Sequence, residues 1–309
     1  MLEYKKDTWK AVVSLAPTLV LMAIFIFWPI INAVRLSFMD GYTIVYDNAG
    51  MKFKLGIENY ITIFKDSVFW TALKNTGIMV VISVPLTIII GLLIAVALNS
   101  IKKLQGVFQT IFFLPYVTNT IALGLVFSTL FNQKYGLINK LLNDDTIFWI
   151  NGIGEPNYWR AILVLTLYTV WNGLAFKIIV FLSGLQSIDK QYYQAAQIDS
   201  ASRWTTFRRI TVPLLSPMIL YITITSFIGA FKGYSSVVSI FNTTTSTGPG
   251  MGPSADTNLL ITVVGYIYNT MYASLMPIGK AASASIILFA IIMLITLVQM
   301  QVSKKRVHY

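Results

Sequence analysis

The chain has 309 residues, of which 56% are hydrophobic and 11% are charged, and its mean hydropathy is +0.69. This composition excludes an ordinary soluble domain and indicates an integral membrane protein. The chain has no cysteine, and its single histidine is His308, so thiol chemistry, a histidine metal cluster and a Ser-His triad are excluded. Around Gly279-Lys280 the residues needed for a phosphate-binding loop are missing, so the chain does not bind ATP by that route.

Six segments are long and apolar enough to cross a bilayer, which takes about 20 residues of helix. They lie near 11–34, 75–99, 107–131, 160–184, 214–238 and 279–301. The first is too long for the core of a signal peptide, so we expect it to be retained as a span. The sequence therefore predicts an all-α integral membrane protein of about six transmembrane helices. A first part, 1–74, holds one helix and an outer-face segment, and 75–309 forms a core of about five helices.

The distribution of charge sets the expected orientation. One set of alternate loops carries twelve Lys and Arg residues against four acids, and the opposite set carries nine against eight. The positive-inside rule places the first set in the cytoplasm. Both termini and the polar segment 186–213 are therefore expected to be cytoplasmic. The net charge of +11 lies at the ends of apolar runs, so no nucleic-acid partner is expected.

The segment 186–213 is polar and basic, between two long apolar runs. Asp189 can cap a first short helix and Ser202 a second. The second is expected to end before Pro213, because proline disfavours helix in the residue before it. The result is a compact pair of helices, in which the small side chains of Ala195 and Ala196 would let another protein approach closely. Composition alone equally allows a solvated basic loop beside the membrane.

The spacing within this segment resembles the EAA motif of permease subunits of ABC importers, which docks on the ATPase subunit. That motif runs Glu-Ala-Ala, three residues, Gly-Ala, and then Phe, Ile and Pro at set distances. The matching positions are Ala195, Ala196, Asp199, Ala201, Phe207, Ile210 and Pro213. Gln194 replaces the usual Glu and Ser200 the usual Gly. A glutamine forms hydrogen bonds but no ion pair with an ATPase arginine.

Further motifs extend the resemblance over nearly the whole chain, to the sugar-importer permeases of the maltose and glycerol-phosphate type. They include Leu15-Ala-Pro17, Phe27-Trp-Pro29, Leu73-Lys-Asn75-Thr76, Phe112-Phe-Leu-Pro115-Tyr116 and Gly184-Leu-Gln-Ser-Ile188. The resemblance implies a second homologous permease, a dimer of ATPase subunits that hold ATP and Mg, and an extracellular solute-binding protein. It also implies a bacterial inner membrane, and no cofactor or enzymatic activity in this chain. The implied coupling residues are Gln194, Ala195, Ala196, Asp199, Ser200, Ala201, Arg203, Phe207, Arg208, Arg209 and Pro213.

Two helical faces are candidates for the substrate pathway, and the resemblance places both beside the sugar cavity. Each face has i, i+3, i+4, i+7 spacing: Thr169, Asn172, Gly173 and Phe176 in the fourth span, and Ser226, Gly229, Ala230 and Gly233 in the fifth. Amides and hydroxyls bond sugar hydroxyls, and an aromatic ring stacks on a sugar's apolar face. For the fifth-span face the Gly-xxx-Gly pattern favours close helix packing over a place in the pathway, and for the fourth-span face the two interpretations are equal.

Two lysines lie within predicted spans, Lys177 and Lys232. An ionisable residue there either faces a cavity or extends to the membrane interface. If either lysine lines the pathway, an acidic saccharide or glycerol phosphate becomes the alternative to the favoured neutral oligosaccharide.

Two other classes fit less well. An ion-coupled secondary transporter would normally show an internal repeat or acids at membrane depth, but here every Asp and Glu lies in a loop or at a terminus. A membrane enzyme would need reactive groups in its spans, and the spans contain no cysteine, histidine or acid pair.

Overall fold

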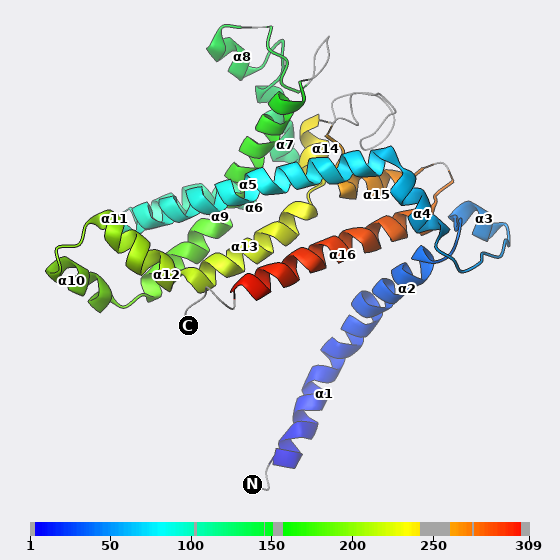
Figure 1. Cartoon of the computed structure of the whole chain (residues 1–309), viewed down its shortest axis with the longest axis horizontal. Helices are drawn as coiled ribbons and strands as arrows, with labels where there is room; N and C mark the ends of the chain where they lie inside the picture. The colour runs from blue at the N-terminus through cyan, green and yellow to red at the C-terminus, as the bar shows by residue number, and fades with distance from the viewer. Residues whose placement is uncertain are drawn as a thin grey trace. The chain divides into compact units, whose positions relative to one another are not determined.

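The computed structural model describes residues 4–101, 104–144, 146–150, 157–241, 260–273 and 275–303. Within these ranges the regular structure is helical, with one isolated bridge between Met39 and Leu55, which confirms the predicted all-α fold (Figure 1). Two compact units are distinguished: Met1–Ser67 with Ile267–Ala290, and Val68–Tyr266 with Ile291–Tyr309. The structure thus groups 267–290 with the amino-terminal unit, while the sequence-based boundary after residue 74 stays a prediction.

The first unit begins with one long helical run. It consists of α1 (Tyr4–Met22), a π-helical turn η1 (Ala23–Phe27) and α2 (Trp28–Ser37). The π turn lies directly before Pro29, whose missing N–H leaves a carbonyl of the preceding turn without its usual donor. In the most apolar 18-residue stretch of this run, no residue is buried by the rest of the chain. In a membrane such a helix faces lipid or another subunit.

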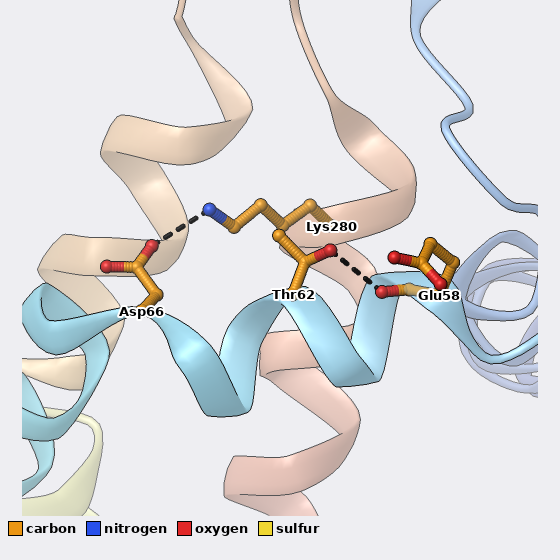
Figure 2. Close-up of polar contacts among 4 residues, drawn as sticks. All are labelled: Glu58, Thr62, Asp66 and Lys280. Carbon is orange, nitrogen blue, oxygen red and sulfur yellow. Dashed lines mark hydrogen bonds and ion pairs between the residues drawn. The ribbon is translucent and has the colours of Figure 1, made fainter.

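The rest of the first unit is held together by buried polar contacts. It contains α3 (Ile44–Asn48), α4 (Glu58–Lys65), most of α15 (Val263–Met271) and the first half of α16 (Ile278–Ser303). The Asn59 amide donates to the carbonyls of Ser37 and Met39 at 3.2 and 2.8 Å, and Ser283 Oγ donates to the Ser37 carbonyl at 2.8 Å. At the end of α4, Asp66 pairs with Lys280 of α16 (Figure 2).

The second unit contains two of the predicted spans as unbroken helices, α5 (Ser67–Ser100) and α9 (Tyr158–Ser187). The predicted span 107–131 is broken into two helices, α6 (Gln105–Val117) and α7 (Thr120–Leu130), which meet at 94°. Asn119 causes the new start, since its Oδ1 accepts the N–H groups of Ile121 and Ala122.

The predicted span 214–238 is also divided, into α13 (Ser216–Phe231) and α14 (Ser235–Phe241). Four helices of the described chain are long enough to span a membrane, or up to six if each of two bent pairs counts as one span, in agreement with the predicted number. The two bent pairs are α6 with α7, and the helical segment Arg203–Leu214 with α13.

The second unit is packed around α5, α9 and α13. A buried cluster lies where the C-terminal ends of α5 and α9 meet the start of α13. It joins Ala95 of α5, Phe181 and Leu182 of α9, and Leu215 and Ile222 at α13. A Cβ atom on Gly184 of α9 would lie 2.8 Å from a Leu215 methyl group, so glycine permits this close crossing. The unit also includes the short helix α8 (Leu137–Leu142).

Candidate functional site: a coupling hairpin and a membrane cavity

The segment after α9 forms the predicted pair of short helices. α10 (Lys190–Ile198) begins at Asp189, whose Oδ1 accepts the Gln191 N–H at 2.9 Å. α11 (Arg203–Thr206) begins at Ser202, whose Oγ accepts the Thr205 N–H at 3.2 Å. Both predicted caps are therefore confirmed. We call the segment from Asp189 to Leu214 the coupling hairpin, because it holds the residues that the sequence predicts for coupling; it lies beyond the end of α9 and the start of α13 (Figure 1).

The turn between α10 and α11 is a Schellman motif. Ala201 N–H donates to the Ala196 carbonyl at 2.9 Å, and Ser200 N–H donates to the Gln197 carbonyl at 3.0 Å. Ser200 has φ of +53°, the left-handed conformation in which glycine is preferred. The EAA motif has glycine at this position. The serine of this chain therefore replaces glycine at the point of the turn where the backbone conformation most favours glycine.

The second helix does not end before Pro213, as the sequence predicted. It continues through a π-helical turn, η2 (Phe207–Thr211), into α12 (Val212–Leu214), and bends by 67° only at Leu215. Pro213 lies within this continuous helical run, and the wider π turn before it accommodates the ring, which would clash with the carbonyl of an α-helical turn. The prediction failed because it considered only an α-helical conformation before the proline.

The exposed surface of the hairpin differs from the predicted Ala-Ala surface. Ala195 is exposed, but Ala196 is only 7% exposed and packs against its own chain. Large apolar side chains are exposed instead, with Ile198 at 84% and Trp204 at 66%. The other predicted coupling residues that are exposed are Gln194, Asp199, Ser200, Arg203, Arg208 and Arg209. Sequence reasoning missed Ile198 and Trp204, although large apolar residues in a polar segment were the available signal.

A cavity of about 280 Å³ lies within the second unit, among α5, α7, α9, α13 and α14. It brings together nine of the ten residues predicted for the pathway: Thr169, Asn172, Gly173, Phe176, Lys177, Ser226, Gly229, Ala230 and Gly233. Lys232 does not line it; this residue is exposed at the C-terminal end of α13. The sequence analysis missed further polar residues of the lining: Ser83, Thr87, Thr120, Tyr168, Thr225 and Ser236.

Asn172 has a structural role within this cavity. Its Nδ2 donates to the Pro115 carbonyl at 3.0 Å, so the amide connects α9 to the broken span. Phe176 lies between two tyrosine rings, with centroids 6.3 Å from Tyr116 and 6.5 Å from Tyr221. Both side chains therefore contact neighbouring elements as well as line the cavity. A group of three metal-ligating side chains does not occur in the parts of the chain that the structure describes.

Comparison with known proteins gives a consistent result. Residues 87–308 match the family described as "Binding-protein-dependent transport system inner membrane component". The lactose transport permease LacF of Rhizobium radiobacter is 32% identical over 94% of this chain and 93% of its own length. The sulfoquinovosyl glycerol permease SmoG of Agrobacterium fabrum is 29% identical over 97% and 92%. The sn-glycerol-3-phosphate permease UgpA of the same organism is 28% identical over 95% and 94%.

The fold also has solved counterparts. A crystal structure of a bacterial alginate ABC transporter, in complex with a periplasmic protein that carries an alginate pentasaccharide, contains a similar chain. The TM-score is 0.80 at 21% identity, and the match covers 98% of this chain and 97% of that one. The chain belongs to the family of inner-membrane components of binding-protein-dependent transport systems. It is an ABC-importer permease.

Proposed function

We propose that this chain forms one half of the translocation pathway of an ATP-driven importer for a saccharide. The second half would come from a homologous permease, and the coupling hairpin would dock on one subunit of an ATPase dimer that holds ATP and Mg. An extracellular binding protein would deliver the saccharide. The names of LacF, SmoG and the alginate transporter support a saccharide as the substrate class.

The observation that carries this proposal is the position of the cavity and the hairpin on the same two helices. α9 lines the cavity from Tyr168 to Lys177 and ends at Ser187, two residues before Asp189, the cap of α10. α13 begins at Ser216, directly after α12, and lines the cavity from Thr225 to Ala230. A movement of the hairpin would therefore act on two cavity walls.

In this proposal α9 and α13 respond to ATP at the hairpin and to the loaded binding protein at the cavity. ATP closure of the ATPase dimer would move the hairpin, and a loaded binding protein would favour the outward-open cavity. Each ligand must bind one conformer better than the other, since only differential affinity shifts such an equilibrium. The hairpin would face the cytoplasm together with both termini, as the distribution of lysine and arginine predicts.

The test measures the ATPase activity of the complete assembly in nanodiscs, in the presence of its binding protein and each sugar of a panel. We would compare wild type with the charge-reversed Arg208→Glu/Arg209→Glu pair on the hairpin. The matched control is Lys52→Glu/Lys54→Glu, an exposed pair in the other unit. We expect the hairpin pair to abolish sugar-dependent stimulation and to lose the ATPase subunit in a pull-down, and the control pair to retain both.

Equal behaviour of the two variants would contradict coupling through the hairpin. Saccharide uptake into liposomes by this chain without any ATPase subunit would contradict the ATP-driven class and favour an ion-coupled transporter.

A further inference from the structure

Lys177 is the charged residue of the cavity lining. It lies on α9, ten residues before the end of that helix at Ser187, which is roughly 15 Å of helix. A lysine at such depth is costly unless its ammonium group faces polar surroundings. The direction of its side chain therefore determines whether the charge belongs to the membrane interface or to the cavity.

The side chain of Lys177 extends away from the C-terminal end of α9. A Cβ atom on Gly173, one turn earlier, would lie 3.2 Å from Lys177 Nζ and 3.3 Å from a methyl carbon of Thr87. A Cβ atom on Gly91 of α5 would lie 3.1 Å from Lys177 Cβ. Two glycines thus leave the space in which the lysine lies, and its Nζ lies beside Gly173 at the cavity wall.

This charge is not neutralised by the surrounding protein. No hydrogen bond or ion pair joins Lys177 to any residue in the described ranges. None of the side chains that line the cavity is acidic. The cavity therefore presents one positive charge, whose three N–H donors make no hydrogen bond to the described protein.

Four of the nine other polar side chains of the cavity are set to act as acceptors toward a ligand. Four side-chain hydroxyls already donate to backbone carbonyls, at distances between 2.6 and 3.2 Å: Thr87, Thr169, Thr225 and Tyr168. A hydroxyl engaged in this way offers only its lone pairs to a ligand. Such acceptors suit the hydroxyl groups of a saccharide, whereas the lysine requires an acceptor on the ligand, most favourably an anionic one.

We propose that Lys177 binds a singly charged acid group of the transported saccharide, such as a uronate carboxylate. One lysine balances one negative charge, which favours a sugar acid over a doubly charged phosphate ester. This reverses the preference for a neutral oligosaccharide that the sequence suggested. The inference rests on the proposed function, because it specifies the ligand of the same cavity.

The test measures ATP-dependent uptake by the complete assembly in proteoliposomes. The probes are matched pairs: mono-, di- and trisaccharides of hexuronic acid, and the same sugars with each carboxyl reduced to an alcohol. The fraction of binding protein loaded by each probe is measured in parallel, and uptake is expressed per loaded binding protein. The variants are Lys177→Gln and Lys177→Arg, with Lys232→Gln as the control because Lys232 lies outside the cavity lining.

We expect wild type to take up the acidic probes at least tenfold better than their neutral partners. Lys177→Gln should remove that difference by lowering acidic uptake alone, Lys177→Arg should retain most of it, and Lys232→Gln should match wild type. Equal effects of Lys177→Gln on both probes, no effect on either, or uptake restricted to neutral probes would overturn the inference. A wild-type assembly that takes up no saccharide with ATP would overturn the proposed function instead.

Discussion

Lys280 Nζ lies 2.8 Å from Asp66 Oδ2, and this ion pair joins α16 to the end of α4 across 214 positions of sequence. Both side chains are largely buried, at 26% and 21% exposure. In Figure 2 the pair lies one helical turn from Thr62, which donates to the Glu58 carbonyl of its own helix. Among the four residues drawn, the ion pair between Asp66 and Lys280 is therefore the contact between distant parts of the chain, and the Thr62 hydrogen bond stays within α4.

Replacing Asp66 with Asn should destabilise the first unit by about 1–2 kcal/mol, between the values of exposed and buried pairs. Thr62→Ala, at an exposed neighbouring position, should change stability by less than about 0.5 kcal/mol. Thermal unfolding of the purified protein in detergent measures both. If the two variants unfold at the same temperature, the ion pair contributes nothing to stability.

Asn75 connects three parts of the second unit. It is 1% exposed; its Nδ2 donates to the Ile261 carbonyl at 3.1 Å, and its Oδ1 accepts from Tyr158 OH at 2.9 Å. Asn75→Leu should cost about 2 kcal/mol or more, because it leaves a buried carbonyl and a hydroxyl without these partners. Tyr158→Phe removes one bond and should cost about half as much. A chemical denaturation series would reveal the ranking, and a larger loss in Tyr158→Phe would contradict it.

The hairpin turn contains two serines for which opposite effects are expected. Ser200→Gly should stabilise the hairpin by up to about 1 kcal/mol, because glycine adopts the observed positive φ without strain. Ser202→Ala should destabilise it by about 1 kcal/mol, because the N-terminal cap of α11 is lost. Hydrogen exchange at the amides of α10 and α11 reports both changes. Faster exchange in Ser200→Gly would contradict the strain argument.

The orientation across the membrane can be measured because the chain has no cysteine. Gln194→Cys introduces one exposed thiol on the hairpin, and Lys140→Cys introduces one on α8. In spheroplasts, a membrane-impermeant maleimide should label Lys140→Cys at once and Gln194→Cys only after lysis. The reverse pattern would place the hairpin outside and contradict the positive-inside assignment.

The sequence alone determined the features that depend on local chemistry. A run of apolar residues specifies a helix and its place in lipid, so the spans at α5, α9 and α16 were predictable. Asp189 and Ser202 cap their helices through bonds to amides two and three residues away, and such bonds need no tertiary information.

Only the tertiary structure decided the features that depend on distant neighbours. The 94° angle between α6 and α7 was not predictable from the segment, although Thr118, Asn119 and Thr120 interrupt its apolar run. Ala196 and Ala195 have the same chemistry but opposite exposure. Lys177 could reach either end of its helix by its own flexibility. The space left by Gly173 and by Gly91, which is distant in sequence, is what places its charge at the cavity.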